Sequence, residues 1–328
     1  MGRQLKGERR ERIDRILSFK STSMLWIVRL CIVWRLTLLS TTAAADYSTS
    51  QEQGLQGTLL FLHVWKCGGT TLRALMCDWA KREGLPCATV AGCNNLSLSE
   101  RKICLQGHKL ISPEIQGDFI SKQRVLAGHF RWGFQVYAAE PHLLVTTLRN
   151  PLELFVSGEQ YLNRRSTSTL EASVQHVESA MRMSLAQLGK RSGCLHRLVG
   201  RSVTTTAEIR EATVEGAQNL RSFWLVGVVE QYNGFIYVLQ ALLDPAYAHA
   251  DLWEPQLEHK LNVSPVRSSN VLAGIDPHLV QEFNSTLSYE WLIYGHAARL
   301  FTARCQDILP EHLHGELCRV PSPPAEYV

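Results

Sequence analysis

The amino-acid sequence predicts an α/β fold, a single domain in which helices flank a central parallel sheet. Two observations lead to this prediction. Continuous apolar runs of strand length occupy residues 58–65 and 142–148, which is the pattern of strands buried on both faces of a parallel sheet. Each run is followed by a short polar turn and then by a segment with apolar residues at helical spacing. At 328 residues the chain is long enough to bury a large core.

The two strand-turn-helix units have clear limits. The first begins at Thr58, and its helical pattern ends at the helix-stopping sequence Gly84-Leu85-Pro86. In the second, the turn Arg149-Asn150-Pro151 precedes a helix that we expect to reach about Arg164. Pro151 suits a first helical turn, where its missing N–H group has no partner to lose. Each unit therefore predicts a loop that leads from a strand into a helix N-terminus.

The remaining segments continue the alternation of strands and helices, and no internal repeat interrupts it. We expect, in chain order, a short strand and a Gly- and aromatic-rich loop over 124–134, a helix over 168–190, an irregular segment over 193–206, a strand over 222–230, a helix over 235–243, a loop over 244–275 and a helical pair over 277–305. The Pro-rich end of the tail at residues 306–328 is typical of disorder.

Charge and hydropathy separate the N-terminus from the rest of the chain. Residues 1–22 hold seven Lys or Arg against three acidic side chains, so this tail carries the whole net charge of +4. A net charge of only +4 for the whole chain argues against a general nucleic-acid binder. Residues 23–45 have about the length that crosses a bilayer, although Arg29 and Arg35 interrupt them. We expect a signal-anchor followed by a polar stem at 46–57, with a cleaved signal or transit peptide as the alternative.

Cysteines and sequons favour an oxidising, lumenal compartment, where the basic flank of the hydrophobic segment also directs the chain. Eight of the nine cysteines follow the hydrophobic segment. They include two groups close in sequence, Cys77, Cys87, Cys93 and Cys104, and Cys305 and Cys318. N-glycosylation sequons begin at Asn95, Asn262 and Asn284. Disulfides are expected, with no pairing assigned. Buried free thiols stay an alternative, and the lack of a CxxC pair argues against zinc.

The turn after the first strand, HVWKCGGTTL at residues 63–72, has the composition of a phosphate-binding loop. Free N–H groups and the helix dipole make a helix N-terminus a binding site for anions. The loop adds glycine backbone, hydroxyl groups and one ammonium group: Gly68 and Gly69, Thr70 and Thr71, and Lys66. Nucleotide-hydrolysing P-loops place the lysine after their glycines, in GxxxxGK[ST], so the lysine-first order argues against ATP or GTP hydrolysis.

Two segments resemble the phosphate-binding motifs of one enzyme family. HVWKCGGTTL is similar to FLHxPKTGGTTL, the 5′-phosphosulfate loop of the Golgi membrane-bound carbohydrate sulfotransferases, such as the heparan sulfate 2-O- and galactose 3-O-sulfotransferases. LRNPLELFVSGEQYL, residues 148–162, is similar to their 3′-phosphate segment LRDPxxRxxSxYxY. Weaker similarity occurs at WLVGVVEQY and in the helix at 289–304. The resemblance covers about residues 58–305 and is most specific at the two loops.

This resemblance implies a sulfotransferase domain of the P-loop-nucleotide-kinase-like type at 58–305. Its activity would be transfer of the sulfuryl group from 3′-phosphoadenylyl sulfate (PAPS) to a hydroxyl of a glycan, proteoglycan or glycolipid by in-line displacement, with no metal. The protein would be a single-pass type II Golgi membrane protein with a lumenal catalytic domain. Acceptor contacts would come from the variable loops 94–122 and 244–275, while the acceptor sugar and the oligomeric state are not indicated.

The resemblance also implies roles for individual residues. Lys66 would stabilise the leaving phosphate. The donor would contact Lys66, Cys67, Gly68, Gly69, Thr70, Thr71, Arg149 and Ser157. His129 is our candidate for the catalytic base, because the family has a Gly-His segment there and imidazole titrates near neutral pH. Asp78, Glu83 and Glu100 are alternative bases, and we interpret His63 as structural support for the loop.

Three departures from the family pattern keep other interpretations open. Trp65 replaces a proline, Cys67 replaces a threonine whose hydroxyl would reach phosphate, and Asn150 replaces an aspartate. A catalytically inactive nucleotide- or glycan-binding protein of the same fold is therefore the second hypothesis, and a P-loop kinase the third. There are also structural alternatives to these roles. Lys66 would then be an ordinary surface lysine at a strand end, and Arg149 and Ser157 would cap and salt-bridge their helix. The aromatic residues Phe130, Trp132 and Phe134 would line an acceptor site or pack in the core.

Overall fold

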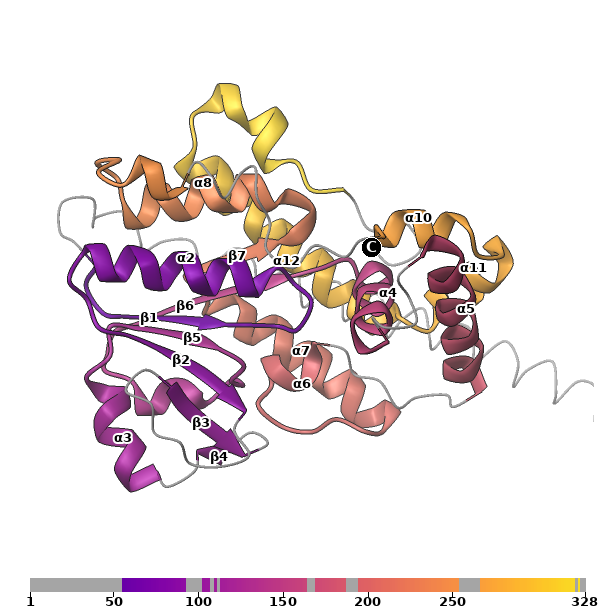
Figure 1. The fold of residues 1–328 in the computed structure, drawn as a ribbon, viewed down its shortest axis with the longest axis horizontal. Coiled ribbons are helices and arrows are strands. Elements are labelled where there is room, and N and C mark those ends of the chain that lie inside the picture. The colour runs from indigo at the N-terminus through magenta and orange to yellow at the C-terminus, as the bar shows by residue number, and fades with distance from the viewer. Residues whose placement is uncertain are drawn as a thin grey trace, which may run out of the picture. The chain divides into compact units, whose positions relative to one another are not determined.

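A sheet of seven strands, in the order β4-β3-β2-β5-β1-β6-β7, forms the centre of the protein (Figure 1). The strands are β1 (Thr58–Leu62), β2 (Cys87–Gly92), β3 (Lys102–Gln106), β4 (Lys109–Leu110), β5 (Val125–Gly128), β6 (His142–Leu148) and β7 (Leu225–Val228). All neighbours pair in parallel except β3 and β4, which are antiparallel. β1 is buried along its whole length between β5 and β6, as its apolar run predicts. The predicted α/β class with a parallel sheet is confirmed.

The computed structural model describes residues 55–92, 102–106, 109–110, 113–163, 169–186, 194–253, 266–321 and 324. From Gly54 onward the chain forms one compact unit, in agreement with a single domain. The basic tail, the hydrophobic segment at 23–45 and most of the stem lie outside the described residues, as do Asn95 and Asn262 of two sequons. Within the described residues, no helix combines the length and the apolar character needed to cross a membrane.

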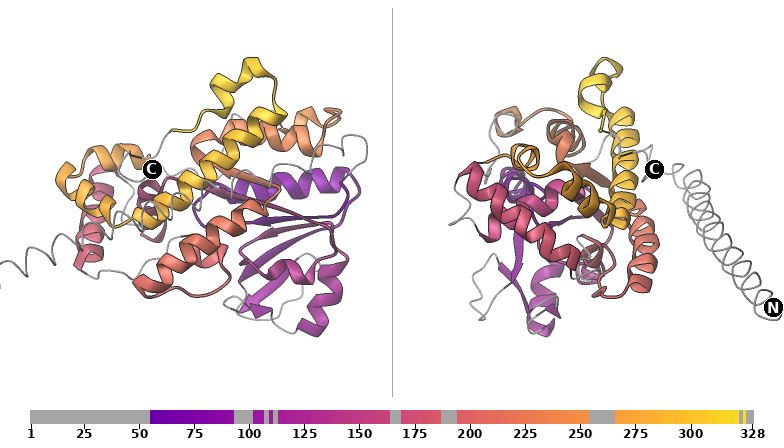
Figure 2. Two further views of the ribbon diagram at one scale, coloured as in Figure 1. Left: turned by 180° about the vertical axis from the view of Figure 1, so that it is seen from behind. Right: turned by 90° about the vertical axis from the view of Figure 1, so that its right-hand side faces the viewer.

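Helices cover both faces of the sheet and extend beyond the carboxyl end of β6 (Figures 1 and 2). They are α2 (Gly69–Arg82), α3 (Pro113–Ser121), α4 (Pro151–Leu162), α5 (Leu170–Ala186), α6 (Leu195–Leu198), α7 (Thr206–Arg221), α8 (Tyr232–Leu243), α10 (Ser268–Ala273), α11 (Pro277–Ser285) and α12 (Ser288–Ile308). Short turns are η2 (Phe134–Tyr137), η3 (Val229–Gln231), η4 (Glu311–Leu313) and η5 (His314–Cys318). α2 packs on β5 and β2, whereas α7 and α12 lie side by side and α12 packs on β7.

A second apolar cluster holds α4 in place from the side away from the sheet. It joins α4 to α5, α10 and α11, which gather together in Figure 1. Its buried members are Val156, Val177, Met181, Val271, Ile275, Leu279 and Phe283. Helix α4 is therefore held between the carboxyl end of β6 and the helices α5, α10 and α11. This packing sets the position of the side chains on its first two turns.

Several predicted elements are correct and others are wrong. Both strand-turn-helix units and the strand ending at Val228 are present. The predicted loop at 94–122 contains β3, β4 and α3, and the predicted loop at 244–275 contains α10. Residues 193–206, predicted to be irregular, include α6 and the start of α7, whose capping box joins Thr205 and Glu208. Short polar helices such as α6 lack the periodicity that would show them in sequence.

Among the described residues, two disulfides link neighbouring elements. Cys77–Cys87 joins α2 to β2, and Cys305–Cys318 joins α12 to η5. Cys67 and Cys194 are free and buried. Of the two cysteine groups close in sequence, the second is thus a pair, and the first contributes Cys77 and Cys87. Cys93 lies outside the described residues.

Candidate functional site

The loop between β1 and α2 ends in a helix N-terminus that no side chain caps. Gly68 occupies the N-cap position with φ 72°, and no side chain accepts a hydrogen bond from the first turn. Lys66 also has a positive φ, 62°, which is uncommon for a residue with a side chain. This tight backbone leaves the first N–H groups of α2 available to an anion.

Glycine at position 69 is required because the ring of His63 lies directly against it. A Cβ atom on Gly69 would overlap the imidazole. His63 itself is buried, and burial first and then the neighbouring positive groups lower its pKa to about 2. A neutral, buried ring behind the loop agrees with the interpretation of His63 as structural support.

Thr70 and Thr71 occupy different environments at the start of α2. Thr70 is partly exposed, whereas Thr71 is buried beside Tyr232. The Tyr232 ring also lies against the open face of Gly68, where a Cβ would meet it at 3.4 Å. The Thr70 hydroxyl is therefore accessible to a ligand, whereas the Thr71 hydroxyl lies inside the protein.

Hydrogen bonds join the second loop to the first. β6 is the neighbour of β1, and Thr147 Oγ1 donates to the carbonyl oxygen of Cys67 at 2.7 Å. Beyond Thr147 come Arg149 and the N-terminus of α4, which therefore open at the same edge of the sheet as α2. Arg149 is close enough to Lys66 that its charge, together with burial as the larger cause, lowers the pKa of the lysine. The N-termini of α2 and α4 and the cationic side chains of Lys66 and Arg149 thus lie at the same edge of the sheet.

Arg149 is oriented by two partners and keeps one donor unused. It forms an ion pair with Glu153 at 2.8 Å and a longer hydrogen bond to Ser268 Oγ at 3.3 Å. Its Nε atom is buried and has no partner among the described residues. Ser157 is buried two turns further along α4. The i,i+4 ion pair matches the structural alternative for Arg149, while the unpaired Nε leaves a donor for a ligand.

Asn150 and Glu230 hold the second loop in shape. The side chain of Asn150 caps α4 by accepting from the N–H groups of Leu152 and Glu153 at 3.0 and 3.2 Å. Its own N–H donates to Glu230 at 2.8 Å, and Glu230 also accepts from Tyr294. Asn150 therefore performs the capping that an aspartate would perform. The role of Glu230 was not predicted, because nothing in WLVGVVEQY relates it to Asn150.

His129 lies where β5 ends, on the other side of β1 from Arg149. Its Nδ1 is 3.1 Å from the carbonyl oxygen of His63, and the two rings stack with centroids 4.1 Å apart. A carbonyl oxygen only accepts, so Nδ1 carries the proton and Nε2 carries the lone pair. Burial, and after it the charge of Arg197, lowers the pKa of His129. At neutral pH this ring is therefore an unprotonated base.

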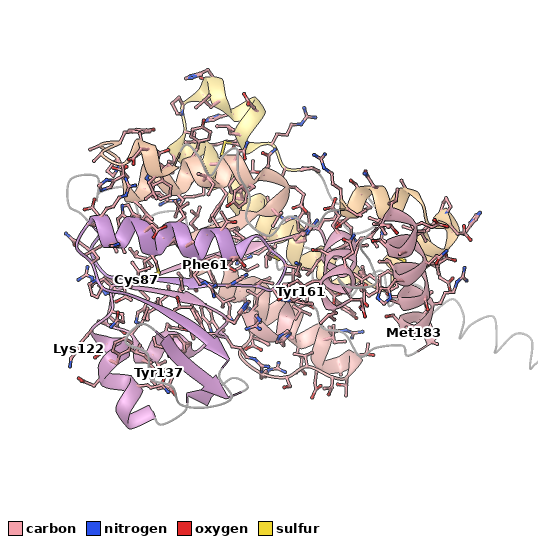
Figure 3. The ribbon with its side chains drawn as sticks, viewed as in Figure 1. Phe61, Cys87, Lys122, Tyr137, Tyr161 and Met183 are labelled. Atoms are coloured by element: carbon pink, nitrogen blue, oxygen red, sulfur yellow. A yellow bond between two sulfur atoms is a disulfide. The ribbon has the colours of Figure 1, made fainter. Side chains whose placement is uncertain are left out.

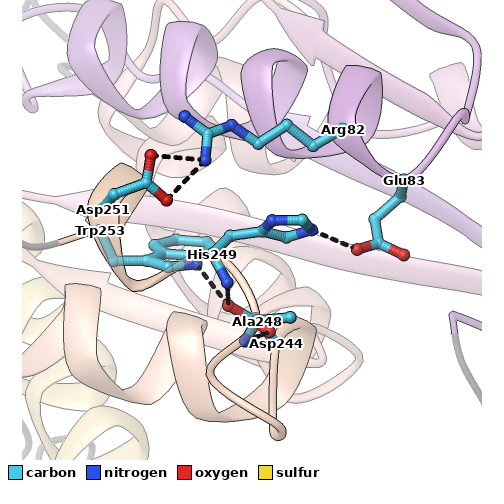
Figure 4. A network of polar contacts seen from close by, with 7 residues as sticks. All are labelled: Arg82, Glu83, Asp244, Ala248, His249, Asp251 and Trp253. Carbon is cyan, nitrogen blue, oxygen red and sulfur yellow. Dashed lines mark hydrogen bonds and ion pairs between the residues drawn. The ribbon is translucent and has the colours of Figure 1, made fainter.

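The alternative bases lie away from the two loops. Glu83 follows the far end of α2, about 20 Å from Gly69 at 1.5 Å per residue over 14 residues. It pairs with His249 at 2.6 Å, in a network that also joins Arg82 to Asp251 (Figure 4). Asp78 lies nine residues after Gly69 on the same helix and is exposed. Glu100 lies outside the described residues. Of the described candidates, His129 is the one beside the loop.

Cys67 faces the interior. Its side chain is fully buried, its thiol lies 3.6 Å from the carbonyl oxygen of Trp65, and its N–H donates to Val64 O at 3.3 Å. Burial raises the pKa of the thiol. Neither donor of Cys67 is free for a ligand in this conformation.

Trp65 packs on α4 in place of the family's proline. A Cβ on Gly158 would approach its ring to 3.1 Å, and its edge meets Tyr161 with centroids 5.6 Å apart. Lys66 Nζ lies 4.3 Å from the centroid of the Tyr161 ring (Figure 3 labels Tyr161). Both aromatic rings are exposed by more than a third. The departure at position 65 thus comes with an aromatic support for the lysine.

The aromatic residues after β5 divide between core and surface. Phe130 and Phe134 are buried and stack with centroids 4.6 Å apart, so they belong to the core. Trp132 is partly exposed against Phe223, and its N–H donates to the carbonyl oxygen of Arg197. An acceptor role stays a prediction for Trp132 alone. Arg197, which α6 brings to this loop, was not predicted.

No protein-family model matches this chain, and no curated protein is significantly similar to it. The argument for function therefore rests on the residues of the site. In the part of the chain that the structure describes, no three His, Cys, Asp or Glu side chains are grouped as a metal site.

Proposed function

We propose that this chain is a PAPS-dependent carbohydrate sulfotransferase, which transfers the sulfuryl group to a hydroxyl of a glycan, proteoglycan or glycolipid. One observation supports the proposal most directly. The two segments that resemble the 5′- and 3′-phosphate motifs lie next to each other, on neighbouring strands, and the hydrogen bond from Thr147 to Cys67 connects them. A donor with phosphates at both ends needs two anion sites next to each other along one edge of the sheet.

The two sites differ in the donors that they offer. The uncapped N-terminus of α2 would bind the 5′-phosphate through backbone N–H groups, with Thr70 and Lys66 beside it. Arg149 would bind the 3′-phosphate through its unpaired Nε, with the Ser157 hydroxyl on the same helix. Bonds between an ionised donor and a phosphate are among the stronger hydrogen bonds in proteins.

The reaction is a displacement at sulfur. The acceptor oxygen forms a bond to sulfur while the bond from sulfur to the 5′-phosphate oxygen breaks. The acceptor proton passes to Nε2 of His129, and the electron pair of the broken bond stays on adenosine 3′,5′-bisphosphate. Lys66 stabilises the charge that develops on the leaving oxygen, as cations do in phosphoryl transfer. The contact of Nδ1 with His63 O supports His129 as the base, because it leaves the lone pair on Nε2.

The same proposal includes the cellular location. We infer a type II Golgi membrane protein with its catalytic domain in the lumen, anchored by residues 23–45. The disulfides Cys77–Cys87 and Cys305–Cys318 support this location, since such bonds persist in oxidising compartments. The alternative of a cleaved signal or transit peptide has a direct test, which is whether residues 23–45 are present in the mature chain.

The test measures donor binding and turnover separately. Purified protein is titrated with adenosine 3′,5′-bisphosphate and then incubated with labelled PAPS and a glycan panel. We expect micromolar binding and transfer to at least one acceptor, with Lys66→Ala losing at least about a hundredfold in kcat, the scale seen when one charge-stabilising donor is removed. Lys122→Ala is the matched control, since Lys122 pairs with Asp118 on α3, away from Tyr161 (Figure 3).

Each other outcome identifies another hypothesis. Tight binding of the bisphosphate without transfer to any acceptor would identify the inactive binding protein. Phosphoryl transfer from ATP would identify the kinase. A Lys66→Ala variant with the parental rate would show that the assignment of the loop is wrong.

A further inference from the structure

Two exposed aromatic rings meet beside the lysine of the first loop. Trp65 lies in the turn after β1, and Tyr161 lies on the last turn of α4. Their ring centroids are 5.6 Å apart and their planes are nearly perpendicular, at 83°. Trp65 is exposed by 36% and Tyr161 by 46%, and Leu162, the next residue on α4, is exposed by 66%. We call Trp65 and Tyr161 the aromatic pair. Two distant segments of the chain thus bring an exposed apolar surface to the candidate site.

Packing holds the aromatic pair in this position. Trp65 lies against the backbone of α4, since a Cβ atom on Gly158 would approach its ring to 3.1 Å. The ammonium nitrogen of Lys66 lies 4.3 Å from the centroid of the Tyr161 ring. The pair therefore adjoins the group that is proposed to contact the leaving oxygen. Exposed Trp and Tyr rings are frequent at binding surfaces, because they offer a large and rigid contact area at a low cost in conformational entropy.

The donor has its contacts elsewhere. Its phosphates are assigned to the N-terminus of α2 and to the buried Nε of Arg149. Its nucleoside can enter a cavity beyond β7, which the bond from the N–H group of Asn150 to Glu230 places next to the Arg149 loop. The lining residues of this cavity are Glu230, Gln231, Tyr232, Asn233, Glu316 and Leu317. The aromatic pair is thus left for the second substrate.

The in-line displacement also directs the acceptor to this side of the loop. The acceptor oxygen must approach sulfur opposite the phosphate oxygen that leaves, and the N-terminus of α2 is assigned to that phosphate. The acceptor therefore enters from the side away from α2, where the loop is open to solvent at Trp65. A sugar whose hydroxyl reacts beside Lys66 would then lie close to the aromatic pair.

We propose that the aromatic pair is an acceptor subsite, on which a pyranose ring of the glycan stacks through its C–H groups. This inference rests on the proposed function, because it assigns the acceptor side of the same site. The C–H groups of a sugar ring are slightly positive and the face of an aromatic ring is negative, so electrostatic attraction adds to the burial of apolar surface. Such a contact needs no charge on the sugar, so neutral glycans would bind as well.

The subsite belongs to this chain and not to the motif that its loop resembles. That motif has a proline where this chain has Trp65. Two of the aromatic residues considered for acceptor contact, Phe130 and Phe134, lie in the core. Trp65 and Tyr161 therefore supply at the surface an aromatic contact that Phe130 and Phe134 do not.

The experiment measures glycan binding to the full-length protein saturated with adenosine 3′,5′-bisphosphate. The probes are a neutral N-acetyllactosamine tetrasaccharide and a non-sulfated chondroitin hexasaccharide, and the tighter binder of the two is used for the variants. In saturation-transfer NMR, irradiation of the aromatic protons of the protein should mark the C–H protons of one sugar ring most strongly. We expect this mark to be lost in Trp65→Leu and kept in Trp65→Phe.

The variants separate the aromatic ring of Trp65 from its bulk. We expect Trp65→Leu to raise the Kd of the oligosaccharide at least about tenfold, equal to about 1.4 kcal/mol, and Trp65→Phe to raise it less than about threefold. The Kd of the bisphosphate should change less than about twofold in both variants. Tyr137→Leu is the matched control, since Tyr137 is exposed by 38% and lies away from Tyr161 (Figure 3).

The results separate this inference from the proposed function. Three outcomes would overturn the subsite and leave the donor site intact: parental glycan binding in Trp65→Leu, an equal loss in Tyr137→Leu, or an unchanged protein that binds the bisphosphate but neither oligosaccharide. A parallel loss of bisphosphate binding in Trp65→Leu would assign the aromatic pair to the adenine of the donor, which also overturns the inference. If the unchanged protein failed to bind the bisphosphate at all, the proposed function would fail, and the subsite with it.

Discussion

The Nδ1 atom of His129 donates to the carbonyl oxygen of His63 across 3.1 Å, and the same two residues stack their rings. This contact connects the end of β5 to the end of β1, since His63 also donates its N–H to Gly128 O at 2.8 Å. One residue thus supports the phosphate loop with its ring and selects the tautomer of its neighbour with its backbone. The candidate base and the candidate phosphate-binding loop are thus positioned by the same residue, His63.

Replacing His129 by asparagine separates its two functions. The Asn amide can still donate to His63 O, whereas the Nε2 lone pair is lost. We expect kcat to fall about 10²- to 10⁴-fold, the usual contribution of a general base, with the Kd of adenosine 3′,5′-bisphosphate unchanged. His142→Asn, at the start of β6, is the control. Parental turnover in His129→Asn would transfer the role of base to another group.

The pH dependence of the reaction follows from the lowered pKa of His129. Burial and Arg197 favour the neutral ring, so the base form persists at and below pH 6.5. We expect kcat/KM to fall in acid as His129 becomes protonated, with the midpoint of the acid limb below pH 6.5. In Arg197→Gln the acid limb should move to higher pH, because a positive charge beside the ring is gone. An acid limb above pH 6.5 in the parental enzyme would contradict this.

Stability should also fall in acid, because His63 is buried as a neutral ring. Its pKa is lowered to about 2, whereas an unfolded chain has a histidine pKa of about 6.5, so the unfolded state binds the extra proton first. The free energy of unfolding is therefore full above pH 6.5 and decreases below it, by up to about 1.4 kcal/mol per pH unit from this residue. Urea unfolding at pH 7 and pH 5 measures the difference, and His63→Phe should reduce it.

Placing at position 67 the threonine of the motif that this loop resembles should not improve donor binding. The Cys67 side chain is buried and its thiol faces Trp65 O, so a hydroxyl there would bond inside the protein as well. We expect Cys67→Thr to leave the Kd of the bisphosphate within about twofold. Tenfold tighter binding would show that residue 67 faces the donor after all.

Tyr161 should act on catalysis through the position of Lys66. Its ring lies 4.3 Å from the lysine ammonium, a contact worth about 0.5–1 kcal/mol at exposed sites. Tyr161→Leu is therefore expected to lower kcat about two- to fivefold, while Tyr161→Phe, which keeps the ring, stays within about twofold. A drop of the same size in Tyr161→Phe would assign the effect to the hydroxyl.

The sequence identifies the parts of this site that a local pattern encodes. Apolar runs predicted β1 and β6, and the turns after them predicted the positions of Lys66 and Arg149 and the start of a helix at Pro151. Their adjacency follows too, since parallel strands bring their carboxyl ends to one edge. Contacts between distant segments have no local pattern. Ser268 reaches Arg149 from a segment predicted as a loop, and Arg197 reaches Phe130 from a four-residue helix.

The inward direction of a side chain is equally hidden from the sequence. Cys67 and Thr71 belong to the motif by position, yet the structure buries both. In a turn with two residues at positive φ, neighbouring side chains diverge by angles that no periodicity describes. Gly69 is required although its φ is not positive, because the turn places the His63 ring directly against it.

Gly69→Ala should destabilise the protein through one overlap. The added methyl would occupy the space of the His63 ring, so either the ring or the start of α2 must move. Overpacking of this kind costs about 1–3 kcal/mol. Gly117→Ala on α3 is the matched control, since a Cβ there meets nothing within 4 Å and alanine favours a helix. In the double variant with His63→Ala the ring is absent, so the cost of Gly69→Ala should shrink to below about 0.5 kcal/mol. An undiminished cost in that background, measured by urea unfolding, would trace the requirement for glycine to the backbone instead of the ring.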